Sequence, residues 1–249
     1  MQKIRIVLPA YNEELSLPSL LKRIDQVHGY FGLNMEVLVV NDGSKDKTPD
    51  IAREYKGNIQ VKLLDLNPNR GLAGAMRAGL TEGIKDLKDD DIVITMDADD
   101  SHHPGLIRRM VSQIHEGSDI VIASRYREGA SIKGLSFFRK FMSWGAGILF
   151  RIIAHVEGVR DYTCGYRAYR VDLLRKAHEK YGDKFIQQQG FSCMSEILLK
   201  LSTLKPVINE LPMILRYDFK MSDSKMNIFK TIRQTLNMLF TFALINRNK

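Results

Sequence analysis

Three carboxylates stand within four positions, at the end of an apolar run, in a chain with a positive net charge. Asp97, Asp99 and Asp100 follow the apolar segment 91–96. Side chains alternate along an extended backbone, so we expect Asp97 and Asp99 to point the same way and Asp100 the other way. Two carboxylates on one face repel each other unless a cation lies between them. Asp97 and Asp99 are therefore candidate ligands of Mg²⁺ or Mn²⁺, which bind oxygen donors and keep positions open for phosphate oxygens.

An Asp-rich surface turn is the alternative, with Ser101 or His103 capping the next helix. This alternative explains one carboxylate better than three, and it fits Asp100, which we expect to face solvent or to cap the turn. A metal that bridges two phosphates would leave anionic charge for arginines to bind. The arginines that could do so are Arg70, Arg125, Arg127 and Arg139. The acids and the arginines together predict a diphosphate ligand.

The elements that would position these residues alternate in type along the first half of the chain. Short apolar runs predict strands over 3–8, 35–40, 60–66, 91–96 and 119–123. Helical periodicity predicts helices over 16–27, 47–55, 72–85 and 104–115. This alternation predicts an α/β fold, with a mostly parallel central sheet covered by helices on both faces. Ligands bind such sheets beyond the carboxyl ends of the strands, so the site should form at the strand-to-helix junctions.

All five predicted junctions are polar. They cover residues 9–14, 41–44, 67–71, 97–103 and 124–126. Ordinary turn chemistry would explain any one of them. Five in succession at one edge of a sheet, with acids and arginines among them, favour a site for a polar ligand.

The pattern changes after residue 125. Segment 137–154 is apolar and aromatic with interleaved basic residues, which fits a core-facing helix and an interfacial membrane helix equally well. We then expect a strand over 162–170, a helix over 191–204, a strand over 206–216 and a final helix from about residue 227. That last helix could dock on a membrane or on a membrane-anchored partner. We expect one domain over residues 1–216 and a C-terminal extension, not an independent domain, over 217–249.

Composition limits the class of protein. The 249 residues are 44% hydrophobic and 27% charged, which is typical of a globular protein. The net charge of +8 indicates an anionic partner: nucleic acid, a nucleotide-linked substrate or a membrane face. No apolar run approaches the roughly 18 residues of a membrane span. With two cysteines and no leader sequence, we expect a cytoplasmic protein that is peripheral at a membrane face.

Seven motifs resemble family 2 glycosyltransferases of the GT-A fold, in the branch of polyprenyl-phosphate and dolichol-phosphate mannose synthases. In chain order they are Pro9–Glu13, Asn41–Ser44, Asn69–Gly71, Asp97–Asp99, Ser124–Tyr126, Cys164–Ala168 and Ser224–Met226. The resemblance covers about residues 4–226. It implies inverting transfer of a hexose, mannose or glucose, from a GDP- or UDP-linked sugar to a polyisoprenyl phosphate at a membrane surface. It implies Mg²⁺ or Mn²⁺ as cofactor and allows a small membrane-anchor protein as partner.

The resemblance also implies a role for each matching residue. The nucleotide would contact Pro9, Ala10, Tyr11, Glu13, Asp42, Gly71 and Asp97. The metal would be bound by Asp97, Asp99 and Ser101, with Asp99 the firmer ligand. Donor or acceptor phosphates would contact Arg125, Arg139, Arg167, Arg216, Lys220, Ser224 and Lys225. The residues expected to be catalytic are Asp97, Asp99, Arg125 and Arg139.

Two positions depart from the family pattern. Ser101 stands where the family often has glutamine, and a hydroxyl is a weaker ligand than an amide carbonyl, so Ser101 could act through water. Phe219 stands where an arginine is expected before the Ser224–Lys225 pair. Arg216 or Lys220 would have to substitute for that arginine.

The chemistry of a phosphate acceptor fits this set of residues. A phosphomonoester is already anionic at pH 7, because its second pKa is about 6. It needs positioning and screening of charge more than a general base, so we assign no catalytic base. A transferase acting on a carbohydrate hydroxyl in polysaccharide synthesis is the alternative. It would need a carboxylate base, commonly in a Glu-Asp pair at a helix start, and segment 191–196 contains no such pair.

Two further classes fit poorly. A non-catalytic nucleic-acid-binding protein would use the positive charge, but the chain lacks a basic helix–turn–helix or an aromatic RNA-binding signature and the acids would be unexplained. We therefore expect no nucleic-acid partner. A dinucleotide-dependent oxidoreductase would need Gly-x-Gly-x-x-Gly after the first strand, where residues 9–13 read Pro-Ala-Tyr-Asn-Glu.

Overall fold

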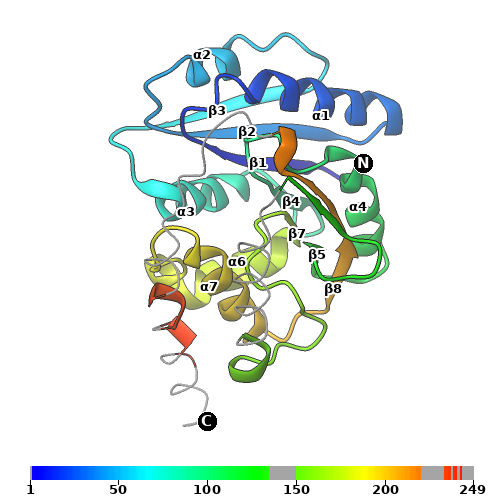
Figure 1. Cartoon of the computed structure of the whole chain (residues 1–249), viewed down its shortest axis with the longest axis vertical. Coiled ribbons are helices and arrows are strands. Elements are labelled where there is room, and N and C mark those ends of the chain that lie inside the picture. Colours follow the sequence, from blue (N-terminus) through cyan, green and yellow to red (C-terminus); the bar gives the residue numbers. More distant parts are fainter. Residues whose placement is uncertain (1, 135–149, 220–232, 237, 240–241, 243–249) are drawn as a thin grey trace.

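The computed structural model describes residues 2–134, 150–219, 233–236, 238, 239 and 242. In the first half, strands and helices alternate (Figure 1): β1 (Ile4–Ala10), α1 (Leu17–Phe31), β2 (Met35–Asp42), α2 (Thr48–Arg53), β3 (Gln60–Leu66), α3 (Gly71–Gly83), β4 (Ile92–Thr95), the 3₁₀ turn η1 (Pro104–Leu106), α4 (Ile107–His115) and β5 (Ile120–Ser124). The second half contains β6 (Ser131–Lys133), β7 (Arg167–Arg170), α6 (Val171–Tyr181), η2 (Gly182–Lys184), α7 (Ser192–Ser202), β8 (Ile208–Pro212), β9 (Ile214–Arg216) and η3 (Tyr217–Phe219).

A seven-stranded sheet in the order β3-β2-β1-β4-β7-β5-β8 forms the centre of the fold. The pairs β1–β2, β2–β3, β1–β4 and β5–β8 are parallel, and β7 is antiparallel to both β4 and β5. A separate parallel pair joins β6 to β9. Because β7 reverses direction between them, β4 and β5 run the same way, and β1 to β5 all end at one edge of the sheet.

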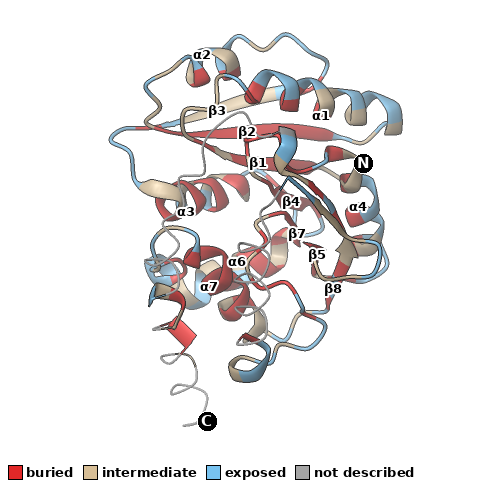
Figure 2. Cartoon of the chain, in the orientation of Figure 1, coloured by how far each residue is buried: buried red, intermediate tan, exposed pale blue. Residues whose placement is uncertain are grey.

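The helices cover both faces of this sheet (Figure 1): α3, α6 and α7 lie on one side, and α1 and α4 on the other. Strands β1, β2, β4 and β5 are almost wholly buried, as expected of strands packed on both faces (Figure 2). Leu17, Leu20, Leu21 and Ile24 of α1 recur at helical spacing and are all buried. These apolar stripes hold the strand ends, and hence the junctions, in fixed positions.

The expected α/β fold with a mostly parallel sheet and helices on both faces is confirmed, and the five strands of the first half lie where periodicity predicts them. Three details of the second half differ. The predicted strand 162–170 is ordered as strand only from Arg167, the predicted strand 206–216 is divided into β8 and β9, and α6 was not predicted. Residues 162–166 instead lie in a segment without strand or helix.

Part of the expected C-terminal extension packs on the domain. Met238 and Leu239 are buried, and the Thr235 hydroxyl lies 3.3 Å from the hydroxyl of Ser192 at the start of α7. Most of the apolar segment 137–154 lies outside the described residues. Within it, Phe150 is buried and stacks on Tyr162, with ring centroids 5.0 Å apart.

Candidate active site at the carboxyl edge of the sheet

The junctions after β1 and β2 are joined by hydrogen bonds into one wall. The Asn12 amide donates to Ser44 Oγ at 2.9 Å, and the Lys45 amide donates to Asn12 Oδ1 at 2.8 Å. The Glu13 amide donates to Thr48 Oγ1 at 2.8 Å. These bonds hold the first junction, which carries Pro9, Ala10, Tyr11 and Glu13, against the second. Ala10 is buried, whereas Tyr11 and Glu13 are partly exposed at the edge of the sheet.

Asp42 ends β2 and connects it to the junction after β3. Its side chain is buried, its Oδ1 accepts a hydrogen bond from the Arg70 amide at 2.7 Å, and its carbonyl accepts one from Asn69 Nδ2 at 2.6 Å. Burial raises the pKa of Asp42, and the hydrogen bonds from the Arg70 and Gly71 amides offset this only in part. Gly71 has a φ of +70°, and no atom lies within 4 Å of the place a Cβ would take. The backbone is therefore open to close approach at the position expected to contact the nucleotide.

The acid turn, residues 97–103, follows β4. Asp99 and Ser101 are buried, and Asp99 Oδ1 accepts hydrogen bonds from the Ser101 amide at 3.1 Å and the Ser101 hydroxyl at 2.6 Å. The side chain of Asp97 is 40% exposed, and one of its oxygens lies 3.9 Å from His102 Nε2. The Asp97 amide donates to His102 Nδ1 at 3.2 Å, and the His102 ring stacks on Tyr166 with centroids 5.1 Å apart. The two candidate metal ligands thus differ: one is held rigidly inside the turn, and the other reaches the surface.

Asp100 differs from the expectation that it faces solvent or caps the turn. It is buried, its Oδ1 lies 2.6 Å from Arg23 Nη1, and its Oδ2 accepts a hydrogen bond from Ser19 Oγ at 2.9 Å. Its φ of +58° is left-handed, so the strand-like alternation used to orient its side chain does not apply. Asp100 therefore points into the molecule, against α1.

The oxygen donors of the acid turn fit a hard divalent cation. Asp97, Asp99 and Ser101 offer two carboxylates and a hydroxyl, which are ligands of the kind that Mg²⁺ and Mn²⁺ bind. Among the described residues, no three His, Cys, Asp or Glu side chains are grouped so that they could hold a metal ion. A cation at the acid turn would complete its coordination with oxygens of a bound diphosphate.

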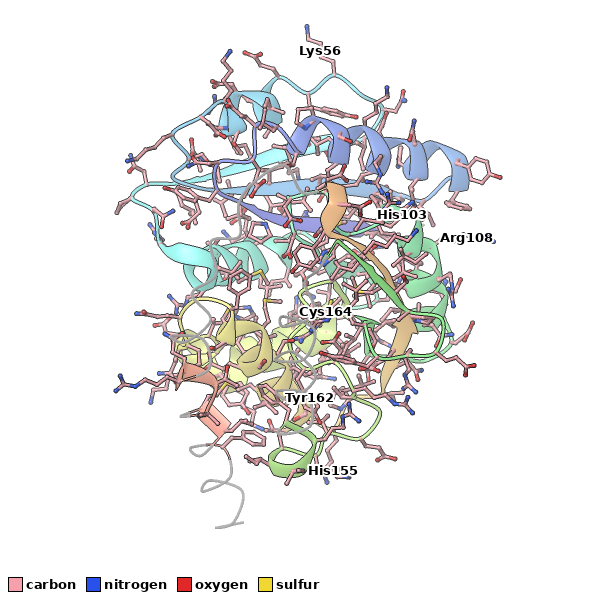
Figure 3. All side chains as sticks on the ribbon, viewed as in Figure 1. Lys56, His103, Arg108, His155, Tyr162 and Cys164 are labelled. Atoms are coloured by element: carbon pink, nitrogen blue, oxygen red, sulfur yellow. The ribbon has the colours of Figure 1, made fainter. Side chains whose placement is uncertain are left out.

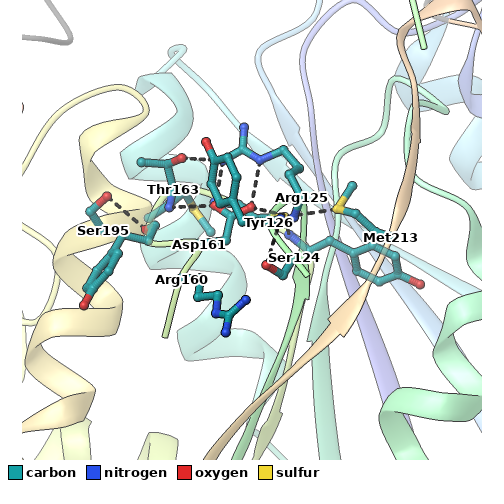
Figure 4. A network of polar contacts seen from close by, with 12 residues as sticks. Ser124, Arg125, Tyr126, Arg160, Asp161, Thr163, Ser195 and Met213 are labelled. Carbon is teal, nitrogen blue, oxygen red and sulfur yellow. Dashed lines mark hydrogen bonds and ion pairs between the residues drawn. The ribbon is translucent and has the colours of Figure 1, made fainter. Parts of the chain in front are cut away.

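Arg125, directly after β5, is held by a buried carboxylate (Figure 4). Its Nε and Nη2 lie 2.8 Å and 2.6 Å from the two carboxylate oxygens of Asp161, and Nη2 also donates to Thr163 Oγ1. Burial opposes the charge of Arg125, but the attraction of Asp161 outweighs it and raises the pKa of Arg125 well above its ordinary value. Among the described residues, none accepts a hydrogen bond from Nη1. Arg125 is thus a permanent cation with a fixed orientation at the same edge as the acid turn.

Asp161 and Glu210 are the residues of this network that sequence reasoning missed. Glu210 Oε1 accepts hydrogen bonds from the Arg160 and Asp161 amides, each at 2.7 Å, and Glu210 Oε2 lies 3.0 Å from Arg127 Nε. Both acids are buried. The signal that could have found Asp161 is its place three residues before Cys164, the first residue of a motif already singled out. A buried arginine needs a carboxylate partner, and Asp161 is that partner for Arg125.

Arg167 was expected to bind phosphate, but the structure places it in the core. Its side chain is fully buried, Nη1 donates to the Met194 carbonyl at 2.7 Å, and Nη2 donates to the Tyr162 carbonyl at 2.8 Å. The guanidinium therefore joins α7 to the loop before β7. An inward-facing position on a strand buried on both faces explains the difference.

Arg216 contacts the acid turn through its backbone. Its amide donates to the Ser101 carbonyl at 3.0 Å, and its guanidinium pairs with Asp218 at 2.8 Å. The other predicted phosphate-binding residues, Arg139, Lys220, Ser224 and Lys225, lie outside the described residues. Their roles stay predictions.

Other polar and sulfur side chains near the edge serve the fold. Glu196 is buried, and its carboxylate accepts hydrogen bonds from the Gln187 and Gln188 amides and from Lys200. Cys164, which Figure 3 labels, and Cys193 are free and buried, and burial raises the pKa of each thiol to about 12. Neither thiol is a thiolate at neutral pH.

None of the helices in the described part of the chain has the length and apolar character needed to cross a bilayer.

Comparison with known proteins finds sugar transferases that are similar to this chain. The dolichol-phosphate mannosyltransferase of Pyrococcus furiosus is 33% identical over 199 residues, which are 80% of this chain and 53% of that protein. The polyprenol monophosphomannose synthase of Mycolicibacterium smegmatis is 33% identical over 70% of this chain and 64% of that protein. The undecaprenyl-phosphate mannosyltransferase of Micrococcus luteus is 32% identical over 227 residues, 90% of this chain and 88% of that protein. The chain thus spans between half and two thirds of the first two relatives and most of the third.

Solved structures share the fold. Glucosyl-3-phosphoglycerate synthase of Mycobacterium tuberculosis, in complex with Mn²⁺, UDP and phosphoglyceric acid, superposes with a TM-score of 0.66 at 18% identity, over 97% of this chain and 78% of that one. The same enzyme with Mg²⁺ and UDP gives a TM-score of 0.64 at 18% identity, over 97% of this chain and 79% of that one. The model of the family described as Glycosyl transferase family 2 matches residues 5–177. The fold, the motifs and these matches together establish that the chain belongs to glycosyl transferase family 2.

Proposed function

We propose that this protein transfers a hexose from a nucleotide diphosphate sugar to a polyisoprenyl phosphate, with inversion at the anomeric carbon and with Mg²⁺ or Mn²⁺ as cofactor. The observation that carries the proposal is the acid turn, where Asp97 and Asp99 stand at the same sheet edge as Asp42 and Arg125. Support comes from relatives that are about one-third identical to this chain over most of its length, and whose names describe polyprenyl-phosphate sugar transferases. Mannose or glucose is the proposed sugar, carried by GDP or UDP.

The nucleotide would bind along the wall formed by the first three junctions. Asp42 is the proposed partner of the base, and the open backbone at Gly71 allows the nucleotide to come close. Tyr11 and Glu13, which are partly exposed at the edge, would complete the pocket. Hydrogen bonds among the junctions fix this wall before any ligand arrives, which lowers the entropy lost on binding.

In the reaction, an oxygen of the acceptor phosphate attacks the anomeric carbon of the sugar from the side opposite the nucleotide. The bond from that carbon to the diphosphate oxygen breaks, the bond to the acceptor oxygen forms, and the nucleoside diphosphate leaves with the electron pair. The acceptor is already ionised, so no protein group has to remove a proton. The hydrogen bonds that occupy Glu196, the carboxylate nearest the start of α7, support a mechanism without a general base.

The protein's contribution is to position two anions and to balance their charge. Asp97 and Asp99, with Ser101, would hold the divalent cation, which supplies positive charge to the diphosphate as it leaves. Arg125 would bind donor or acceptor phosphate through the guanidinium edge that Asp161 does not occupy. Arg139, Lys225 and their neighbours are proposed to complete the acceptor site. We place the enzyme at the surface of a membrane, with residues 217–249 as an extension of the catalytic domain of residues 1–216.

The proposal is tested by transfer of radiolabel into an organic phase. The purified chain is incubated with undecaprenyl or dolichyl phosphate and, in separate reactions, with labelled GDP-mannose, UDP-glucose or other sugar nucleotides, each with Mn²⁺, with Mg²⁺ or with EDTA. We expect label in the lipid fraction from one donor, only when metal is present. Nuclear magnetic resonance of the product then gives its anomeric configuration. Absence of lipid label from every donor would overturn the proposal, and label transferred to a polysaccharide instead would favour the alternative acceptor.

A further inference from the structure

A charged clamp joins the acid turn to helix α1. Asp100 Oδ1 lies 2.6 Å from Arg23 Nη1, and Asp100 Oδ2 accepts a hydrogen bond from Ser19 Oγ at 2.9 Å. Asp100 is 6% exposed, and the side chain of Arg23 is 21% exposed. We refer to Asp100, Arg23 and Ser19 as the Asp100 clamp. Because the clamp is largely shielded from water, the attraction between its two charges is screened less than in an exposed pair of the same length.

The same residue also sets the bend that orients Asp99. The φ of +58° at Asp100 is uncommon for a residue other than glycine, and it persists where surrounding contacts hold it. This bend returns the Ser101 amide and hydroxyl onto Asp99 Oδ1, at 3.1 Å and 2.6 Å. The side chain of Asp100 therefore fixes the turn to α1, while its backbone sets the direction of the Asp99 carboxylate.

Other contacts hold the acid turn as well, among them the hydrogen bond from the Asp97 amide to His102 Nδ1, which spans the bend. The Ser101 carbonyl accepts a hydrogen bond from the Arg216 amide, and the His102 ring stacks on Tyr166. These last two contacts hold the part of the turn that follows the bend. The clamp acts at the bend itself, one residue after Asp99.

We propose that Asp100 is a positioning residue for the cation site, and that the Asp100 clamp holds Asp99 in the orientation that binds the metal and its diphosphate. This inference rests on the proposed function, since it takes the acid turn as the metal site. Asp100 acts through Asp99 and is not itself a ligand. Removing a group that orients a metal ligand typically weakens metal binding by about 10- to 100-fold.

The test is a double-mutant cycle on Asp100→Asn and Arg23→Met, with Mn²⁺ binding as its readout. Asparagine tolerates the left-handed backbone and still accepts a hydrogen bond from Ser19, so Asp100→Asn removes the charge and keeps the bend. Mn²⁺ affinity is measured by electron paramagnetic resonance, for Mn²⁺ alone and in the presence of UDP or of GDP. We expect each single variant to weaken Mn²⁺ binding by about tenfold. The double variant should bind Mn²⁺ about as well as the single variant with the lower Mn²⁺ affinity, because both changes remove the same interaction.

A matched control comes from the buried ion pair at the other end of the sheet, Arg5 with Glu36. Arg5→Met and Glu36→Gln should lower the melting temperature and leave Mn²⁺ affinity within about twofold of the wild type. If the wild-type chain binds Mn²⁺ but the Asp100 and Arg23 variants bind it equally well, the clamp proposal is overturned and the proposed function is not. Effects that multiply in the double variant would also overturn the clamp. If wild type binds no Mn²⁺ with either nucleotide, the proposed function itself fails.

Discussion

Buried carboxylates lie at both ends of the sheet formed by β1 and β2, and the two ends differ in how the charge of these carboxylates is balanced. At the amino end, Glu36 contacts three cations: Arg5 on the paired strand, Lys3 at 2.9 Å and Lys62 at 3.3 Å. Burial opposes the charge of Glu36, but the hydrogen bonds and charges of Lys3 and Arg5 outweigh it and lower its pKa. The amino end is neutralised within the chain.

At the carboxyl end, two buried carboxylates, Asp42 and Asp100, show the opposite balance. The pKa of Asp42 is raised by burial despite hydrogen bonds from two backbone amides. The pKa of Asp100 is raised by burial and by the nearby Asp99, despite Ser19 and Arg23. This difference indicates that the two ends of the sheet have different roles. The amino end stabilises the fold, and the carboxyl end holds buried carboxylates whose charged forms burial disfavours and a bound cation would stabilise.

The largest expected effect comes from removing negative charge at the carboxyl end. Asp99→Asn keeps an oxygen that can accept the hydrogen bonds of Ser101, and Asp99→Ala removes it. Both should reduce lipid-linked sugar transfer by about 1,000-fold or more, because the cation proposed to stabilise the departing diphosphate would lose a ligand. Transfer is measured by organic-phase label, and circular dichroism checks that the fold is intact. Full activity of Asp99→Ala at low metal concentration would refute the division of work between the two ends.

The next largest effect should appear at the amino end, in stability alone. Arg5→Met leaves Glu36 buried without its closest partner, and breaking a buried ion pair from one side costs about 3 kcal/mol or more of the free energy of unfolding. Urea denaturation measures this loss. The KM for the nucleotide sugar should stay within about twofold of wild type at a temperature where the variant is folded. A donor KM that rises with no change in stability would contradict the assignment of this end to the fold.

Arg125 provides a further test of the difference between the two ends, because it lies at the carboxyl end and yet is ion-paired. Arg125→Lys keeps the charge but loses the paired contacts with both oxygens of Asp161, so the cation shifts relative to the phosphate that it is proposed to bind. We expect kcat/KM for the lipid phosphate to fall by about 100-fold, since a small misplacement of a binding group has an effect of that size. Steady-state kinetics with varied acceptor measure it.

Arg5→Lys is the matched control for Arg125→Lys, because it makes the same change in a buried pair at the amino end. It should lower stability and leave the acceptor kinetics unchanged. Equal kinetic effects of the two substitutions would mean that Arg125 serves the fold and does not contact phosphate.

Much of the fold follows from local sequence patterns. The buried runs of β1, β2 and β4 and the helical stripe of α1 are local, so their positions could be predicted. The antiparallel insertion of β7 could not, because it depends on pairing with strands distant in the sequence. Helix α6 did carry a signal: Val171, Leu174 and Ala177 are spaced by three residues and buried, and this was overlooked.

The residues of the site also fall into those that local sequence could predict and those that depend on tertiary contacts. The residue types of Asp97 and Asp99, and their place after a strand, pointed to the acid turn. The inward direction of Asp100 depends on Ser19 and Arg23, about 80 residues earlier in the chain, so no local pattern contained it. Arg167 illustrates the same limit, since its partners are two carbonyls that only the tertiary structure brings to it.

The smallest expected effect is a difference in how stability depends on pH at the two ends. Glu36 has a lower pKa folded than unfolded, so the unfolded state binds more protons, and the stability it contributes is lost as pH falls below its ordinary value of 4.5. Asp42 has a higher pKa folded than unfolded, so its charge costs stability at neutral pH, and that cost disappears as pH falls through the folded pKa. A tenfold difference in proton affinity between the two states corresponds to about 1.4 kcal/mol.

Glu36→Gln and Asp42→Asn should therefore change the pH profile in opposite directions. Relative to wild type, Glu36→Gln should lose less stability on acidification, because the group that must be protonated is gone. Asp42→Asn should lose more, because the relief from protonating Asp42 is gone. Urea denaturation from pH 7 to well below 4.5, the ordinary pKa of Glu36, measures both. Profiles that change in the same direction would mean that the carboxyl end is neutralised within the chain like the amino end, and that it needs no cation from outside.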